Sequence, residues 1–278
     1  MSDSIRIALL QMRSALDPRT NAAFMADAVR EAAQNGAAMI FTPEMSGLVD
    51  RDRARAAESI RREEDDLVLA AMREAARDSA IWIAIGSLAI DKGEGRWANR
   101  AFVIDDRGEI AARYDKIHMF DVELGNGDDW RESNAYDAGD TLAVVDTPVG
   151  RLGLSICYDI RFPALYDALG RAGCDVIAIP AAFTAPTGEA HWHVMQRARA
   201  IEASAFVVAA AQCGHHEDGR RTFGHSLVID PWGEVLLDMG ADGSRLGFAE
   251  IDRTRIDEVR RKLPSLANRR AIPDLASI

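Results

Sequence analysis

Short apolar runs of strand length recur along the chain, and two kinds of connection separate them. Amphipathic segments join some runs, such as residues 20–35, which carry apolar side chains at helical spacing and end at Gly36. Tight turns join others, at residues 106–108 and 148–150. Strands connected through helices run parallel, and strands connected by tight turns run antiparallel. The sequence therefore predicts an α/β protein with mixed sheets packed in layers.

The individual elements follow from the same patterns. Residues 52–79 are charged and Ala-rich, which predicts one long exposed helix, and a polar, Gly-rich loop spans about 121–140. We find no linker, low-complexity tract or break in composition, so we expect one domain over 1–278, with a core of about 5–252 and a C-terminal tail of 253–278. Two hairpins are expected over 97–120 and 140–157. The other expected strands are 5–12, 38–44, 81–90, 174–180, 205–213, 224–230 and 244–252, and the other expected helices are 162–173 and 189–204.

Composition excludes several classes of partner. The chain of 278 residues carries a formal net charge of −11, which disfavours nucleic acid and anionic membranes. No run approaches the roughly 18 apolar residues of a membrane span, and the first residues lack the pattern of a signal peptide. The cysteine number, 3, does not suit a disulfide framework. We therefore expect a cytoplasmic protein that acts on a small molecule.

Three polar residues follow apolar strands: Glu44, Lys116 and Cys157. Ligand sites of layered α/β proteins gather at the carboxyl ends of strands, so the three side chains could share one pocket. Lys116 could then favour the thiolate of Cys157, and Glu44 could take the thiol proton and later pass it to a leaving amine. Taken singly, each residue has an ordinary structural interpretation: Cys157 as a buried thiol, Glu44 as a carboxylate in a surface turn and Lys116 as a solvated ammonium.

The segments around these residues are more specific. TPEMSG, YDKIHMFD and GLSICYDIRFP resemble, in this order, the signatures of the nitrilase (carbon–nitrogen hydrolase) superfamily. The resemblance runs from residue 5 to residue 270. It implies an α-β-β-α sandwich of two mixed sheets, usually assembled as a homodimer, with no cofactor and no metal.

The resemblance also implies roles for single residues. Cys157 corresponds to the nucleophile, Glu44 to the general base and acid, and Lys116 to the electrostatic stabiliser, while the backbone N–H of Tyr158 completes an oxyanion hole. A second acid corresponds to Glu132 in WRESNAYDAGD; Glu123 is the rival, and Glu132 could also be a loop carboxylate bonded to backbone.

Four further residues are candidates for substrate binding. Arg161 either binds a substrate carboxylate or braces the nucleophile turn by pairing with Asp159 or a helix terminus. His118 either donates to a substrate oxygen or caps a loop. Phe183 and Thr187 are expected to line the mouth of the pocket.

Three stretches, residues 207–226, 228–235 and 186–202, resemble most closely one branch of the superfamily, the deaminated glutathione amidases. This predicts hydrolysis of deaminated glutathione to 2-oxoglutarate and cysteinylglycine through a Cys thioester. The alternatives are an omega-amidase acting on 2-oxoglutaramate, and another aliphatic amidase or a nitrilase. Arg161 suits both 2-oxo acid substrates and does not separate them.

Other readings are weaker. HWH (191–193) and CGHH (213–216) suggest a metal, but the first pair points to different sides of a helix, and the second, read as a loop, lacks a partner pair at zinc spacing. A Cys–His peptidase would need His118 or His225 to take the thiol proton, and peptidase signatures are absent. A catalytically silent binding protein would be expected if one of the three polar residues were missing.

Overall fold

The computed structural model describes residues 4–123 and 130–273, which form two six-stranded mixed sheets. In the first sheet, β1 pairs parallel with β2 and antiparallel with the late strand β16, and β2, β3, β4 and β5 follow in order. The strands are β16 (Arg245–Asp252), β1 (Ser4–Gln11), β2 (Met39–Phe41), β3 (Trp82–Gly93), β4 (Arg96–Ile104) and β5 (Ile110–Asp115).

The second sheet repeats the mixture of parallel centre and antiparallel edges. β9, β10 and β11 run parallel, and antiparallel neighbours flank them on both sides. The strands in spatial order are β15 (Val235–Asp238), β14 (Leu227–Ile229), β11 (Phe206–Ala209), β10 (Val176–Ala178), β9 (Gly150–Leu154) and β8 (Val144–Thr147).

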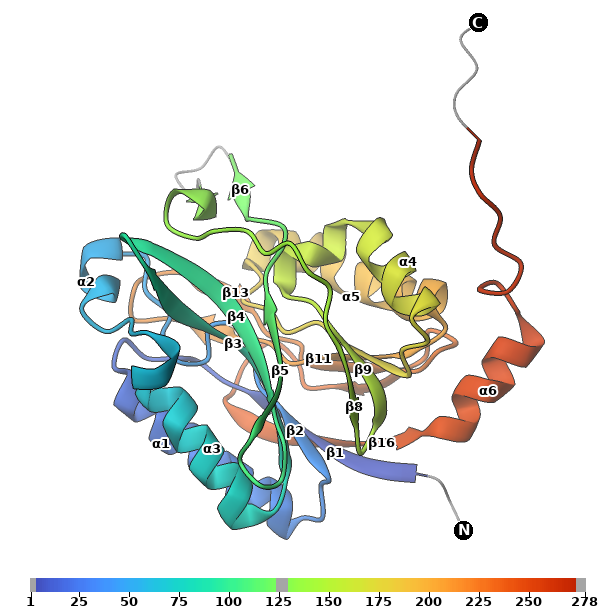
Figure 1. The fold of residues 1–278 in the computed structure, drawn as a ribbon, viewed down its shortest axis with the longest axis horizontal. Helices are drawn as coiled ribbons and strands as arrows, with labels where there is room; N and C mark the ends of the chain where they lie inside the picture. The colour runs from blue at the N-terminus through green and yellow to red at the C-terminus, as the bar shows by residue number, and fades with distance from the viewer. Residues whose placement is uncertain (1–3, 124–129, 274–278) are drawn as a thin grey trace, which may run out of the picture.

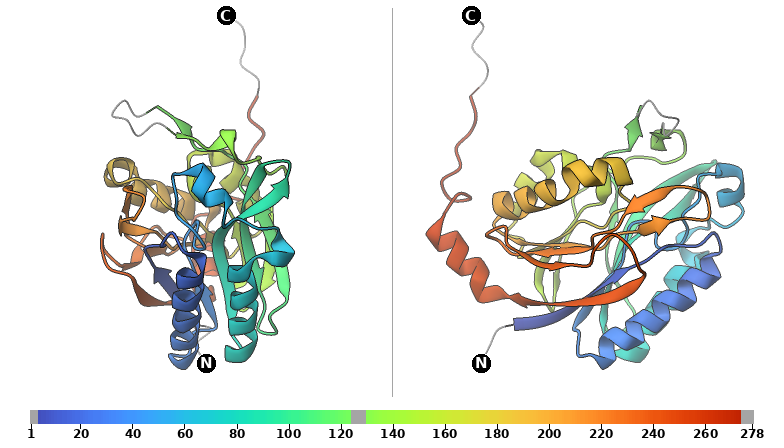
Figure 2. Two further views of the ribbon diagram at one scale, coloured as in Figure 1. Left: turned by 90° about the vertical axis from the view of Figure 1, so that its left-hand side faces the viewer. Right: turned by 180° about the vertical axis from the view of Figure 1, so that it is seen from behind.

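Helices cover the outer face of each sheet, so the molecule has four layers (Figure 1). α1 (Pro18–Gln34) and α3 (Leu67–Ser79) lie side by side on the first sheet, and α4 (Pro163–Arg171) and α5 (Ala185–Ala203) cover the second (Figure 2). Between the sheets, Leu9 and Phe41 share one buried cluster with Leu154 and Ala178. The implied α-β-β-α sandwich is confirmed.

Apolar spacing explains how α1 attaches to its sheet. Its buried residues Ala22, Met25, Val29 and Ala32 recur every three or four positions and form one apolar face. Asp17 caps the first turn by accepting the N–H of Arg19. The helix therefore has a defined start and a buried face, as the sequence predicts.

The prediction of one exposed helix over 52–79 is wrong. The segment contains α2 (Arg53–Ala57), the 3₁₀ turn η1 (Glu63–Asp65) and α3. Asp66 restarts the chain as a helix because its carboxylate accepts the N–H of Leu69. α3 is also not exposed along its length, since Val68, Met72 and Ala76 are buried against the first sheet.

Shorter elements complete the fold. CGHH does not lie in a loop, because Cys213–His215 form β12, which pairs with β13 (Arg221–Phe223). Within the polar segment 121–140, β6 (Asp121–Val122) pairs with β7 (Trp130–Arg131), and the rest of that expected loop includes positions 124–129, outside the described residues. The remaining elements are η2 (Glu132–Asn134), η3 (Cys157–Arg161) and α6 (Arg253–Lys262).

Candidate active site

A buried ammonium lies between two carboxylates at one end of the first sheet. Lys116 follows β5, and its Nζ atom is 2.9 Å from Oε1 of Glu44 and 2.9 Å from Oε2 of Glu132. The side chains of Lys116, Glu44 and Glu132 are 2%, 6% and 12% exposed. Removing one partner of a salt bridge this well buried would leave an uncompensated charge inside the protein.

Cys157 reaches the same place from the second sheet. β9 ends at Leu154, and three residues later Cys157 opens the turn η3 with φ at +46°, in the left-handed region that non-glycine residues rarely adopt. Its N–H donates to the carbonyl of Pro180 at 2.9 Å, and its thiol bonds to Glu44. Strain of this kind persists where the surrounding structure fixes it, and it is frequent at active sites.

Contacts from three directions fix Glu44. Its Oε2 accepts the N–H of Ala182, which follows β10 of the second sheet, at 2.8 Å, and its carbonyl accepts Nε2 of Gln212 at 3.0 Å. Behind it, Gly86 of β3 approaches so closely that a Cβ atom there would lie 2.2 Å from the carbonyl oxygen of Thr42. Glycine is required at this position because the two backbones touch.

Charge and burial set the protonation states of the cluster. Burial raises the pKa of Glu44, but the Lys116 ammonium and hydrogen bonds from Cys157, Lys116 and Ala182 together lower the pKa below its usual value. Burial lowers the pKa of Lys116, but Glu132 and Glu44 raise this pKa well above the ordinary value. Both groups are therefore charged at neutral pH.

The thiol behaves differently from the expectation. Burial, followed by the negative charge of Glu44, raises the pKa of Cys157 well above its usual value, and Lys116 only partly opposes the rise. The expected thiolate stabilised by Lys116 is wrong, because burial and the Glu44 carboxylate together outweigh the Lys116 ammonium. At rest, the site holds a neutral thiol beside an ionised base.

Asn99 is a member of the cluster that the sequence patterns do not reveal. It lies in β4, and its Nδ2 donates to Oε1 of Glu44 and Oε1 of Glu132, each at 3.0 Å. Its Oδ1 is buried with no hydrogen-bond partner among the described residues. Nothing in the local sequence WANRAFVI separates Asn99 from an ordinary strand residue, so only the pairing of strands brings it to the carboxylates.

Asp159 organises the turn that carries Cys157. It is fully buried, and its carboxylate accepts the N–H of Ile156 at 2.9 Å and the hydroxyl of Tyr114 at 2.7 Å. Nδ1 of His118 lies 2.7 Å from Oδ1 of Asp159, and the His118 ring stacks on Phe162 at 3.6 Å. His118 is thus attached to the nucleophile turn, and its ring is partly exposed beside it.

Arg161 makes no ion pair with any carboxylate of the described residues. Asp159, its expected partner, bonds to other groups, so this form of the bracing hypothesis is wrong. The guanidinium lies over the rings of Tyr158 and Phe183, 5.8 Å and 5.5 Å from their centroids, and 3.4 Å from Nδ1 of His191. This cation is therefore held against aromatic faces with its charge uncompensated.

The other expected site residues lie at different distances from the cluster. Phe183 directly follows Ala182, the donor to Glu44, and packs on Trp192. Thr187 bonds to Thr184 in the first turn of α5, and no contact places it at Glu44, Lys116 or Cys157. Glu123, the rival of Glu132, pairs instead with Arg131 on the surface.

The histidines proposed for other chemistries also have defined partners. His118 contacts Asp159 and His225 contacts Asp238, so neither lies on the Cys157 thiol as a peptidase would require. In CGHH, His215 is exposed and His216 is buried against Thr222. The two do not form a joint metal site.

Comparison with known proteins decides the family. A family model described as carbon-nitrogen hydrolase matches residues 6–261. The chain belongs to the carbon-nitrogen hydrolase family. It is 38% identical over 272 residues to the deaminated glutathione amidase of Yersinia enterocolitica, an alignment that covers 97% of this chain and 94% of the relative.

Solved structures of similar proteins share the fold. The C. elegans NitFhit protein superposes with a TM-score of 0.89 at 37% identity, covering 96% of this chain and 65% of that chain. An amidase variant from Nesterenkonia sp. AN1, whose structure shows acrylamide added to the active-site cysteine, superposes with a TM-score of 0.78 at 26% identity, covering 94% of this chain and 98% of that chain.

As a carbon-nitrogen hydrolase acting on amides, the protein has a cluster suited to acyl transfer. It combines a sulfur nucleophile, an ionised carboxylate that contacts it and a fixed ammonium, which are the components of nucleophilic catalysis with a charged intermediate. None of the helices in residues 4–123 and 130–273 combines the length and apolar character of a membrane span.

Proposed function

We propose that this amidase acts on deaminated glutathione and releases 2-oxoglutarate and cysteinylglycine. The uncompensated guanidinium of Arg161, in the turn that begins with Cys157, supports recognition of a 2-oxo acid carboxylate, a group that 2-oxoglutaramate also has. The 38% identity to the deaminated glutathione amidase of Yersinia enterocolitica carries the choice of deaminated glutathione between the two.

In the first half of the reaction, Glu44 accepts the thiol proton as the sulfur of Cys157 attacks the amide carbonyl. The hydrogen bond between the two side chains provides the path for this proton. Lys116 and the backbone N–H of Tyr158 stabilise the oxyanion of the tetrahedral intermediate. Glu44 then gives the proton to the amine nitrogen, the C–N bond breaks, and a thioester remains on Cys157.

In the second half, Glu44 deprotonates a water that attacks the thioester carbonyl. The C–S bond breaks, the carboxylic acid leaves, and the proton returns to the sulfur. Glu132 acts as a positioning residue in this scheme: its carboxylate holds Lys116 and Asn99, and it accepts the N–H of Phe120 at 2.7 Å. Removing Glu132 should therefore lower activity through Lys116.

The remaining residues bind substrate in this proposal. Arg161 pairs with the carboxylate, the second ring nitrogen of His118 donates to a substrate oxygen, and Phe183 forms part of the wall. Thr187 is proposed for the outer rim, because its hydroxyl already bonds to Thr184 near Phe183.

A side-by-side assay tests the substrate. Purified protein is given deaminated glutathione and 2-oxoglutaramate, and kcat/KM is measured for both, with an aliphatic amide and a nitrile panel as controls. We expect a clear preference for deaminated glutathione. A preference for 2-oxoglutaramate makes the protein an omega-amidase, and turnover of the simple amides or nitriles alone refutes recognition of a 2-oxo acid.

An Arg161→Gln variant separates binding from chemistry. We expect KM for the 2-oxo acid substrate to rise about 10- to 100-fold with little change in kcat, since a charge-assisted hydrogen bond contributes about 1.5–3 kcal/mol. An uncharged amide of similar size is the control and should not respond. An equal loss with both substrates means that Arg161 supports the turn instead.

Assembly and compartment are also proposals. Val194 and Ile201 are exposed on one face of α5, and the turn with the exposed Trp232 packs beside Ile201 through Gly233. We propose that a second copy covers this surface in a homodimer, which sedimentation of the wild type against a Trp232→Glu variant tests.

The free cysteines suit a cytoplasmic location, tested by cell fractionation. A single calorimetric transition would support one domain over 1–278.

A further inference from the structure

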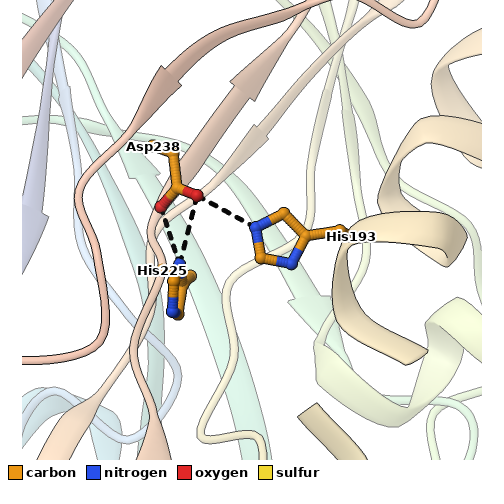
Figure 3. Close-up of side chains that lie close together, drawn as sticks. All are labelled: His193, His225 and Asp238. Atoms are coloured by element: carbon orange, nitrogen blue, oxygen red, sulfur yellow. Dashed lines mark hydrogen bonds and ion pairs between the residues drawn. The ribbon is translucent and has the colours of Figure 1, made fainter. Parts of the chain in front are cut away.

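Two histidines and an aspartate from distant parts of the chain converge at the outer side of the second sheet (Figure 3). His193 comes from α5, His225 from the residues just before β14, and Asp238 from the end of β15. The reaction proposed above uses none of the three. The sequence did not reveal the group, because the three positions have no regular spacing.

The donor atoms point toward one carboxylate oxygen. Nε2 of His193 and Nδ1 of His225 lie 3.0 Å and 3.1 Å from Oδ2 of Asp238, and one ligand atom from each residue lies within 4.8 Å of the others. In tetrahedral zinc sites, bonds of about 2.0–2.2 Å place neighbouring ligand atoms about 3.3 Å apart. From separations within 4.8 Å, the ligand atoms would have to approach one another by at most about 1.5 Å to form such a coordination sphere.

Neighbouring groups hold the three side chains in place. The N–H of Gly240 donates to Oδ1 of Asp238 at 2.9 Å, which orients the carboxylate, and the ring of Phe223 stacks on His225 at 4.6 Å. The backbone carbonyl of His225 accepts Nε1 of Trp192 at 2.8 Å. Supporting contacts of this kind orient ligands in known metal sites.

Exposure and charge also suit a cation. The side chains of His193, Asp238 and His225 are 39%, 34% and 23% exposed, so solvent can reach the group and supply a further ligand. With both imidazoles neutral, the three side chains carry one negative charge in total, and a bound divalent ion changes the net charge of the group from −1 to +1. Two imidazoles and a carboxylate are typical ligands of zinc and related first-row ions.

We propose that His193, His225 and Asp238 bind a divalent first-row transition-metal ion of the zinc class. The ion replaces the protons that now link both imidazoles to Asp238, and water completes its coordination. It fastens α5 to the strands β14 and β15, so its role is to stabilise the second sheet with its covering helix and not to take part in amide hydrolysis.

Cobalt(II) titration of EDTA-treated full-length protein tests the proposal, with visible absorption as the readout and zinc(II) as competitor. We expect one equivalent of cobalt to give a d–d spectrum that zinc abolishes. The His193→Ala and Asp238→Asn variants should lose this equivalent, and His215→Ala, which removes an exposed histidine of β12, should keep it.

Thermal unfolding with and without zinc gives a second readout. Zinc should raise the Tm of the wild type and of His215→Ala but not that of His193→Ala. His193 is a partly exposed helix residue, so its variant should fold even if His225→Ala does not. Equal metal uptake by the wild type and His193→Ala, or no uptake by the wild type, overturns the proposal and leaves Asp238 as a hydrogen-bond acceptor for two imidazoles.

Discussion

The Nζ atom of Lys116 lies 2.9 Å from Oε1 of Glu44, although the two residues are 72 positions apart and their side chains are almost fully buried. A buried ion pair adds little net stability, but removal of one partner leaves an uncompensated charge. Here the consequence is larger, because Lys116 also neutralises Glu132. The cluster therefore makes stability and activity depend on the same ammonium.

Replacing Lys116 with Met should abolish turnover and lower the free energy of unfolding by about 3–5 kcal/mol, because two buried carboxylates lose their counter-ion. Urea unfolding measures the stability, and Lys92→Met, at a surface pair with Asp137, is the control. The double variant Lys116→Met with Glu44→Gln should regain part of the stability and none of the activity. Strictly additive losses would contradict this coupling.

A Cys157→Ala variant should lose turnover and keep its fold. Alanine has a Cβ atom, as cysteine does, so it adopts the left-handed φ of +46° at the same cost and the strain in the turn does not change. Circular dichroism and Tm check the fold, and Cys213→Ala, a buried thiol away from the cluster, is the control. Residual wild-type activity in Cys157→Ala would refute the thioester mechanism.

The pH–rate profile should report the carboxylate of Glu44. Because the pKa of Glu44 is lowered from 4.5 by Lys116 and its hydrogen bonds, against the effect of burial, the base stays ionised down to pH values below 4.5. We expect kcat/KM to be flat through neutral pH and to fall only in that acidic range. An acid limb near pH 6 to 7 would instead indicate a histidine base.

Asn99→Asp should shift this acid limb to higher pH. The substitution places a third carboxylate beside Glu44 and Glu132, and a nearby negative charge raises the pKa of Glu44. We expect a displacement of about 1 pH unit and a kcat reduced at least 10-fold. Asn99→Leu, which removes the hydrogen bonds without adding charge, should lower kcat with a smaller shift; equal shifts would argue against the electrostatic explanation.

His216 should make the protein less stable in mild acid. Burial lowers its pKa from 6.5 to about 4, so between these pH values the unfolded chain binds a proton that the folded protein does not. The free energy of unfolding should fall by about 3 kcal/mol as the pH drops through this range and level off below it. His216→Gln should flatten the pH dependence, whereas His215→Gln should not.

Much of the fold could be predicted because apolar runs and helical spacing are local signals. The strand before Glu44 and the one before Cys157 follow from such runs, and the nitrilase resemblance supplied the layering. The break before α3 does not follow from composition. Asp66 begins a new helix because its carboxylate accepts the N–H of Leu69, and a charged, Ala-rich composition does not show this hydrogen bond.

The site was predicted only where motifs carry it. Glu44, Lys116 and Cys157 stand in recognisable segments, but Asn99 reaches them through the pairing of β4 with its neighbours, and Asp159 through a turn that buries its carboxylate. The raised pKa of Cys157 depends on the separation between charges in three dimensions. Sequence spacing contains no information on such distances.

The cluster is assembled from both sheets. Glu44, Asn99 and Lys116 belong to the first sheet, while Cys157 and the N–H of Ala182 belong to the second. Neither sheet alone contains both a nucleophile and a base, so the enzyme works only while the two layers keep their alignment. A small displacement of one sheet relative to the other should therefore reduce activity. In mild denaturant, activity should decay before either sheet loses its own hydrogen bonds.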